Sequence, residues 1–259
     1  IRAWLAQFES NAERCLAFKI LENINFYGEA RVREKLKIIH DVVRREVVYS
    51  VKSGERFRRD IIVSAFGPPS KSGSSYLRMY VSENGIISNG VKSPADIPKA
   101  LSVDEQTKAV VFIDDIIGSG TTIIDCLREF SEAAGAIISQ RDILVVVGVI
   151  CGLRSGVEKV LQVIDSGEFP FRVELKVCDV LDDGDRAFSQ VSQLFDEGDK
   201  HKAQVMARKY GSKLQSRHPL GYADSQLLVV FKDNCPNNTL PIIWCSGENP
   251  KWVPIFKRI

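Results

Sequence analysis

The 259-residue sequence is poor in histidine and has no closely paired cysteines. It contains three His and six Cys, and no two Cys are spaced as C-x-x-C. The usual patterns of a structural zinc site are therefore missing. We expect the cysteines to be reduced and mostly buried, as in a cytoplasmic protein.

The sequence also lacks a charge excess and a long apolar run. Lys and Arg number 35 against 33 Asp and Glu, so the net charge of +2 gives no overall attraction to nucleic acid or membrane. The longest apolar stretch, residues 143–153, is too short to cross a bilayer, and no signal peptide is visible. We therefore expect a cytoplasmic protein with no membrane partner.

Strand and helix patterns alternate in the middle of the chain. Short apolar runs occupy Ile61–Ala65, Ala109–Ile113 and Ile143–Ile150, and helical spacing of apolar residues separates them. Unbroken β-branched runs are typical of strands buried on both faces of a parallel sheet. Residues 171–180 alternate apolar and charged side chains instead, as a half-exposed edge strand does. The pattern predicts an α/β fold with a doubly wound, mainly parallel sheet.

The flanking regions have a different character. Residues 1–50 predict two helices, the second with an apolar face, and residues 185–215 predict a charged helical region. A Gly-, Pro- and Asn-rich stretch around a short strand at Leu227–Phe231 follows. No linker is visible, so we predict one domain over 1–259, with a helical element at 1–50, an α/β core at 51–184 and a C-terminal region at 185–259.

An acidic pair lies within the segment VVFIDDIIGSGTT, Val110–Thr122. Asp114 and Asp115 directly follow the apolar strand Val110–Ile113. Two adjacent carboxylates must stay hydrated or find donors, because burying them unpaired is costly. The vicinal hydroxyls of a sugar are suitable donors. The alternative is a pair of solvated acids at a strand end.

The loop after the acids has the composition of a phosphate cradle. It leads into a helix and consists of Gly118, Ser119, Gly120, Thr121 and Thr122. Glycines let backbone N–H groups turn toward an anion, hydroxyls add donors, and the helix N-terminus adds positive potential. A diol site next to a phosphate site predicts a ribose 5-phosphate ligand. The P-loop and dinucleotide motifs fit worse, because the required Lys and third Gly are missing.

A second loop occurs one strand–helix unit earlier. It follows Ile61–Ala65 and contains Ser70, Lys71, Ser72, Gly73 and Ser74. Lys71 and the helix that begins near Ser74 would attract an anion, although an ordinary surface loop is the alternative. The polar stretch Ile86–Gln106 that comes next is either a lid over the site or a surface loop.

The segment Val110–Thr122 resembles the phosphoribosyl pyrophosphate (PRPP) signature of type I phosphoribosyltransferases. The resemblance implies the type I core with a variable hood. It implies that Asp114 and Asp115 contact the ribose 2′ and 3′ hydroxyls, that Gly118 through Thr122 hold the 5′-phosphate, and that Ser70–Ser74 bind pyrophosphate. It also implies that PRPP arrives with Mg²⁺, held mainly by substrate oxygens and not by direct protein ligands.

One position departs from the purine-salvage branch of that family. Gly118 stands where those enzymes usually carry an Asp that handles a proton on the base. Glycine cannot act as an acid or base, so a hypoxanthine or guanine acceptor is disfavoured. Any such catalyst would have to come from the hood.

The C-terminal stretch Gly221–Trp244 is similar to a phosphoribosyltransferase-like family predicted in prokaryotic anti-phage conflict systems, some encoded beside retron reverse transcriptases. The resemblance implies a homo-oligomer and a defence complex with reverse transcriptase or nucleic acid. Aromatic faces and amides suit a base or partner site, with core packing and turn chemistry as alternatives. The hood candidates are Tyr222, Asp224, Phe231, Asn237, Asn238 and Trp244.

The predicted function is that of an enzyme that binds PRPP and transfers or releases the phosphoribosyl group with loss of pyrophosphate. Asp114, Asp115 and Lys71 are the predicted catalytic residues, and the acceptor is a base, water or a macromolecule. The alternatives are a catalytically silent sensor of PRPP or nucleotide that regulates a partner, and a defence effector held inactive by partner subunits.

Overall fold

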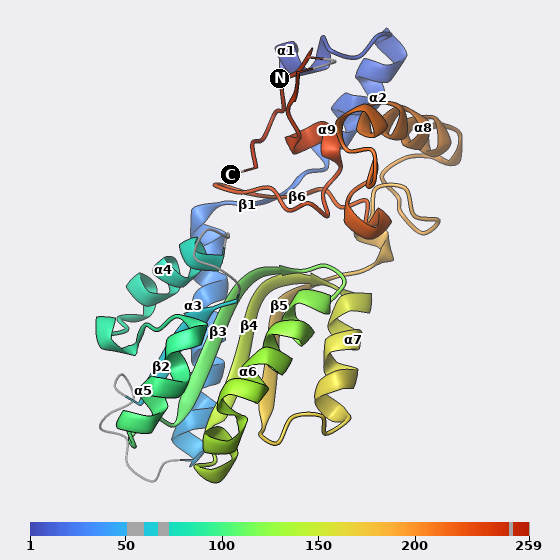
Figure 1. Cartoon of the computed structure of the whole chain (residues 1–259). Coiled ribbons are helices and arrows are strands. Elements are labelled where there is room, and N and C mark those ends of the chain that lie inside the picture. The colour runs from blue at the N-terminus through green and yellow to red at the C-terminus, as the bar shows by residue number, and fades with distance from the viewer. Residues whose placement is uncertain (51–59, 67–72, 249–250, 259) are drawn as a thin grey trace. The chain divides into compact units, whose positions relative to one another are not determined.

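The structure is a computed structural model that describes residues 1–50, 60–66, 73–248 and 251–258. It contains two compact units, shown in Figure 1. Unit 1 combines Ile1–Glu29 with Leu181–Ile259, and unit 2 is Ala30–Val180. The predicted helical element at 1–50 is therefore divided between the two units.

A four-stranded sheet forms the centre of unit 2. Its strand order is β2 (Ile61–Ala65), β3 (Ala109–Ile117), β4 (Leu144–Leu153) and β5 (Val173–Leu181). Strand β3 pairs in parallel with both β2 and β4. The predicted α/β fold with a mainly parallel sheet is confirmed, and β5 occupies the edge expected from its alternating side chains.

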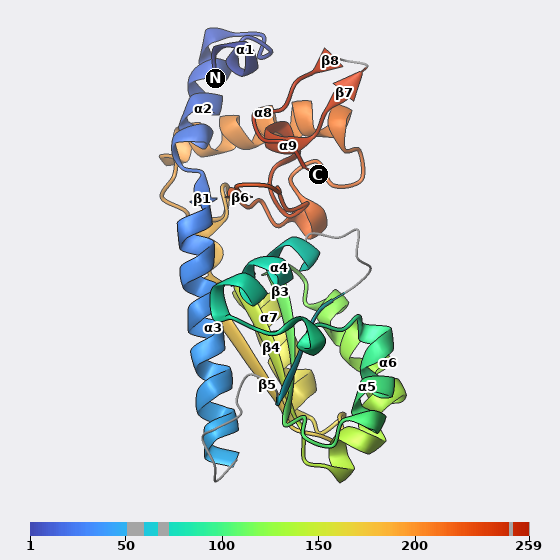
Figure 2. The same ribbon diagram turned by 90° about the vertical axis from the view of Figure 1, so that its left-hand side faces the viewer.

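Helices cover both faces of this sheet. The helices of unit 2 are α3 (Glu29–Ser50), α4 (Gly73–Asn84), α5 (Ile97–Val103), α6 (Thr121–Gln140) and α7 (Arg154–Asp165). Figure 2 shows α3 on one side of the sheet and α5 with α6 on the other. The side chain of Ile39 in α3 packs directly on β4, because a Cβ added at Gly148 would lie 2.4 Å from its Cγ2 atom. This arrangement is the predicted doubly wound one.

The chain reverses its winding direction between β2 and β3. After β2 and α4 it returns to the free edge of β2, where Val91 forms an isolated parallel bridge with Val63. It then crosses to the opposite edge of β2 to form β3. Ligands of doubly wound sheets bind outside the carboxyl ends of the strands at such a reversal.

The expected lid, Ile86–Gln106, is a packed part of unit 2. It contains the short 3-10 helices η1 (Ser88–Gly90) and η2 (Pro94–Asp96) and the helix α5. Ile97 and Leu101 of α5 are fully buried in the core that also contains β3 and α6. The segment is therefore anchored to the core of unit 2 through α5, while Ile87 and Val103 stay exposed.

Unit 1 is built from the two ends of the chain. Its N-terminal elements are α1 (Arg2–Leu5), α2 (Asn11–Glu22) and β1 (Asn25–Tyr27). Its C-terminal elements are η3 (Asp183–Asp185), α8 (Glu197–Leu214), η4 (Tyr222–Asp224), β6 (Val229–Phe231), α9 (Pro241–Trp244), β7 (Gly247–Glu248) and β8 (Lys251–Trp252). Strands β1 and β6 form a parallel pair. The predicted helical region at 185–215 is helical only over α8.

An aromatic cluster holds the two ends of unit 1 together. The ring of Phe8 lies 5.0 Å from the rings of Trp4 and Tyr210 and 5.3 Å from that of Trp252, all in edge-to-face geometry. The indole N–H groups of Trp4 and Trp252 both donate to the carbonyl oxygen of Ile242. Phe8 is fully buried, so this cluster is the centre of the unit 1 core.

The cysteines are less buried than expected. All six are free thiols, but only Cys151 and Cys235 are buried. Burial raises the pKa of the Cys235 thiol to about 12, so this group stays protonated at neutral pH.

Within the described residues, no helix is both long and apolar enough to cross a membrane.

Candidate functional site

Strand β3 extends beyond β2 where the acidic pair occurs. The register with β2 ends at Ile113, whereas the register with β4 continues to Ile117. Asp114 and Asp115 therefore lie inside β3, directly after its last residue paired with β2. The prediction that the strand ends at Ile113 was wrong, because pairing with β4 on the other edge extends it.

The two carboxylates differ in exposure. Asp115 is only 5% exposed, whereas Asp114 is half-buried. The Oδ1 atom of Asp114 accepts the backbone N–H of Asp115 at 2.9 Å, and that of Asp115 accepts the N–H of Ile116 at 3.0 Å. A carboxylate has about four lone-pair sites, so it can accept several hydrogen bonds at once. Asp114 is the more open of the two.

The predicted pyrophosphate loop reaches the same end of the sheet. Gly73, the first residue of α4, lies beside the acidic pair: a Cβ added there would be 3.7 Å from the Oδ1 atom of Asp114. Ser74 follows in the first turn of α4 and is half-buried. The remaining three predicted residues, Ser70, Lys71 and Ser72, lie outside the described residues. The structure thus brings Gly73 and Asp114 together at the reversal between β2 and β3.

The predicted phosphate loop connects β3 to α6. Gly118, Ser119 and Gly120 form a bend, and Thr121 and Thr122 are the exposed first residues of α6. The hydroxyl of Ser119 donates to that of Thr121 at 3.2 Å. Helix α6 has no acidic residue in its first turn, and its N-cap position is a glycine without a side chain. The first-turn N–H groups and three hydroxyls therefore gather where an anion is best stabilised.

Two glycines determine the shape of this loop. Gly120 has φ = 76°, a left-handed conformation that favours glycine, and a Cβ there would lie 2.7 Å from the carbonyl oxygen of Gly156. A Cβ on Gly156 in α7 would lie only 2.0 Å from the carbonyl oxygen of Gly118. The start of α7 thus packs against the backbone of the loop with no room for a side chain.

Lys159 is a loop neighbour that sequence reasoning missed. Its ammonium group donates to the hydroxyl of Thr121 at 3.1 Å. Lys159 follows Gly156 by three residues, so both lie on the face of α7 that meets the loop. The spacing from Gly156 was visible in the sequence, but the contact between α7 and the loop was not. Lys159 adds a positive charge beside the helix N-terminus.

The described residues contain no cluster of three or more His, Cys, Asp or Glu that could hold a metal ion. Carboxylate oxygens suit Mg²⁺, and the half-buried Asp114 offers oxygens at the edge of the site. Asp114 is thus chemically able to contact a Mg²⁺ ion that a phosphorylated ligand brings with it.

Three of the predicted hood residues are used for packing and turns. Phe231 is buried in β6 and stacks on Tyr27, with ring centroids 5.0 Å apart. The amide of Asn238 is buried and donates to the hydroxyl of Ser225 at 3.2 Å. The indole of Trp244 donates to the carbonyl oxygen of Thr239.

The other three predicted hood residues are more open. Tyr222 is 41% exposed, and its backbone N–H donates to the carbonyl oxygen of the half-buried Asn237 at 2.8 Å. Asp224 is exposed and lies 3.9 Å from Arg208. The backbone thus brings Tyr222 and Asn237 together.

Comparison with known proteins agrees with this fold. A sequence profile of the PRTase-CE family matches residues 1–258, nearly the whole chain. A search of curated proteins gave no match. The chain therefore belongs to PRTase-CE, a phosphoribosyltransferase-like family.

Proposed function

We propose that this phosphoribosyltransferase-like protein binds PRPP and transfers or releases its phosphoribosyl group with loss of pyrophosphate. The observation that carries the proposal is the meeting of Asp114 with Gly73 at the end of the sheet that also holds the loop Gly118–Thr122. In the proposed complex the ribose faces Asp114, the 5′-phosphate faces the loop Gly118–Thr122, and the pyrophosphate faces the start of α4 at Gly73.

Each element has a distinct role in the proposed site. Asp114, with Asp115 behind it, accepts hydrogen bonds from the ribose hydroxyls. The loop N–H groups, Thr121 and Lys159 hold the 5′-phosphate through charge-assisted hydrogen bonds. Two anchors at opposite ends of the ribose leave the anomeric carbon in a defined place, and such positioning is a large part of catalysis in group transfer.

The reaction breaks the bond between the anomeric carbon and pyrophosphate. A lone pair of the acceptor forms the new bond to that carbon, and the acceptor proton passes to solvent or a base. The transition state is oxocarbenium-like, so stabilising the departing negative charge is the main electrostatic task. Lys71 and the start of α4 are the proposed groups for it. Mg²⁺ bound with PRPP supplies further charge neutralisation of pyrophosphate.

A silent PRPP or nucleotide sensor that controls a partner is the second candidate. Gly118 favours it, because this position has no acid–base group and its carbonyl oxygen is packed against Gly156. The acidic pair and the loop with Lys71 favour an enzyme. In either case we propose a homo-oligomeric effector of prokaryotic anti-phage defence, acting with a reverse transcriptase or nucleic acid. This role is supported by sequence resemblance.

Pyrophosphate release from PRPP with Mg²⁺ tests the proposal. Wild type is compared with Asp114→Asn, Asp115→Asn and the double variant, with a panel of bases, nucleotides and nucleic acids as acceptors. Asp165→Asn is a matched control, because this exposed aspartate lies at the far end of α7. We expect the double variant to lose release, with Asp114→Asn the more damaging single change.

The outcomes separate the candidates. Release that requires the acidic pair establishes an enzyme, and the compound that stimulates it identifies the acceptor. PRPP binding without release, lost in the double variant, supports the sensor. Absence of PRPP binding in the wild-type protein would overturn both candidates.

A further inference from the structure

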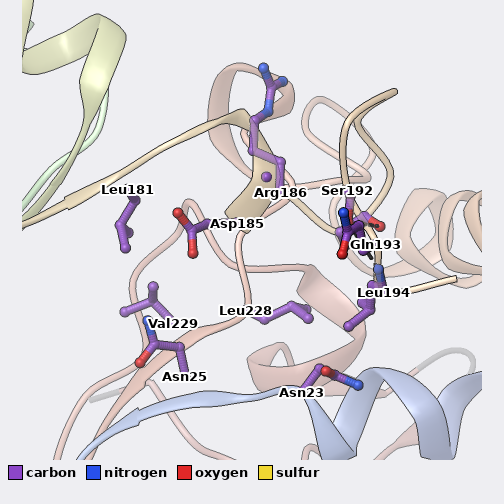
Figure 3. A pocket seen from close by; sticks show the side chains of 12 residues that line it. Asn23, Asn25, Leu181, Asp185, Arg186, Ser192, Gln193, Leu194, Leu228 and Val229 are labelled. Carbon is purple, nitrogen blue, oxygen red and sulfur yellow. Dashed lines mark hydrogen bonds between the residues drawn. The ribbon is translucent and has the colours of Figure 1, made fainter.

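Unit 1 contains a cavity that none of the sequence motifs indicates. Its volume is about 300 Å³, at the small end of the range for small-molecule sites. Figure 3 shows it from close by. Its lining comes from three separate stretches of unit 1: Asn23 and Asn25; Leu181, Gly184–Ala187 and Ser192–Leu194; Leu228 and Val229. None of the six predicted hood residues is among them.

The cavity has an apolar floor and a polar rim. Leu181, Leu228 and Val229 are each no more than 5% exposed and form the floor. In Figure 3 the side chains of Asp185, Asn23 and Gln193 lie around Leu228 on different sides. All three are exposed. This combination suits a ligand with a flat apolar body and polar groups on its edge.

The rim offers mainly hydrogen-bond acceptors. The Oδ2 atom of Asp185 accepts the N–H of Asp182 at 2.7 Å, which leaves Oδ1 available. The Nδ2 group of Asn23 donates to the carbonyl oxygen of Lys19, which leaves its Oδ1 atom available. Gln193 adds an amide that both accepts and donates. A ligand rich in N–H donors would satisfy these groups.

The charge of the lining disfavours phosphates. Arg186 is the one cation among the twelve lining residues, but its guanidinium points away from the cavity in Figure 3. It is held there by Asp183 at 3.2 Å and by the carbonyl oxygen of Asp224 at 2.7 Å. Asp185 is therefore the only charged side chain of the lining that faces the cavity, and it would repel an anionic ligand.

We propose that this cavity is a binding site for a small nitrogen heterocycle that carries amino or ring N–H donors and no phosphate. The heterocycle lies on Leu228 and Val229, and its N–H groups donate to Asp185 and Asn23. A cavity of about 300 Å³ accommodates one ring system but not a whole nucleotide. The inference does not depend on the PRPP site, because every lining residue belongs to unit 1.

Calorimetric binding to the full chain tests this proposal. The probes are adenine, guanine and cytosine, with ribose 5-phosphate and AMP as anionic comparisons. Gly184→Trp covers the cavity, because a Cβ at Gly184 has no atom within 4 Å. Gly198→Trp is its control, since this residue of α8 is equally unobstructed and does not line the cavity. Asp185→Asn removes the charge, with the exposed Asp233→Asn as its control.

We expect an amino-bearing base to bind in the cavity. Ribose 5-phosphate is the proposed ligand of the loop Gly118–Thr122 in unit 2, so its binding should be the same in Gly184→Trp as in wild type. Gly184→Trp and Asp185→Asn should each weaken binding of that base about tenfold or more, the usual effect of losing a hydrogen bond to a charged group. Both controls should bind as wild type does. Equal affinity of Gly184→Trp and Gly198→Trp for the base, weaker binding of ribose 5-phosphate to Gly184→Trp than to wild type, or no binding of any base would overturn the proposal.

Discussion

The two units present their candidate sites in opposite ways. In unit 2 the site is made largely of backbone: the bend at Gly118–Gly120, the start of α6 and the end of β3 define it, and side chains complete it. In unit 1 the cavity is made of side chains from three distant stretches. A backbone site leaves a compact trace in the sequence, because its spacing is local. A site made of side chains from distant stretches leaves no local pattern in the sequence.

The largest expected effect is the loss of the unit 1 core in Phe8→Ala. Removing a fully buried phenylalanine that contacts three aromatic rings costs about 3–5 kcal/mol of unfolding free energy. Hydrogen exchange should show weaker protection of α8 while β3 keeps its protection. The exposed Phe18→Ala is the control. Equal loss of protection in β3 would mean that the two units do not behave as separate cores.

Gly156→Ala should affect unit 2 alone. The added Cβ would lie 2.0 Å from the carbonyl oxygen of Gly118, so the loop or α7 must shift. Overpacking of this kind costs about 1–3 kcal/mol, and we expect ribose 5-phosphate binding to fall sharply with it. In Gly184→Ala the added Cβ would have no atom within 4 Å, so the unfolding free energy and ribose 5-phosphate binding should stay unchanged. Normal phosphate binding in Gly156→Ala would show that the loop does not need its observed shape.

Lys159→Gln should have a smaller effect that is limited to phosphate binding. The side chain is exposed, so its loss should weaken ribose 5-phosphate about tenfold or less without changing the unfolding free energy. The affinity of the variant should also depend less on salt concentration. Lys99→Gln changes an exposed lysine on α5 and should bind as wild type does. If ribose 5-phosphate binds equally to both variants, Lys159 does not contact the phosphate.

The smallest expected effect is the acid sensitivity of unit 1 through Glu13. Burial raises the pKa of this carboxyl, but hydrogen bonds from Lys209 and Tyr210 outweigh it and hold the pKa below its ordinary value. The stabilisation is therefore present above a pH of about 4.3 and is lost as the pH falls through the folded-state pKa.

Unfolding of wild type and Glu13→Gln between pH 7 and pH 3 measures this contribution. The difference in unfolding free energy should be present at pH 7 and should shrink toward pH 3. Glu22→Gln changes an exposed glutamate of the same helix and should follow the wild-type curve. A constant difference across the pH range would show that Glu13 acts through its shape and not its charge.

The sheet and the glycine bend after β3 could be predicted because their signals are local. The apolar runs at Ile61–Ala65 and Ala109–Ile113 became β2 and β3, and Gly120 took the left-handed conformation that glycine favours. The extension of β3 through Asp114 could not be predicted, since it depends on pairing with β4. The same holds for Lys159, whose contact with Thr121 requires the docking of α7.

The hood candidates of unit 1 stay a prediction, and two of them have structural roles that the sequence left open as alternatives. Asn238 and Trp244 have side chains that recognise ligands in other settings, but here the backbone and neighbouring hydroxyls satisfy them. The residues that do line the cavity, such as Asn23 and Asp185, carry no local pattern. Two other lining residues, Asn25 and Val229, are brought together by the parallel pairing of β1 with β6.

The contact between Gly156 and Gly118 has a consequence for how this family can vary. The carbonyl oxygen of Gly118 is pressed against α7, so the loop cannot become deeper on that side without repacking the helix. Side chains can be replaced with little loss of stability at the exposed positions Thr121, Thr122 and Lys159. If the loop binds an anion as proposed, we expect changes of ligand preference to arise at these three side chains, with both glycines kept.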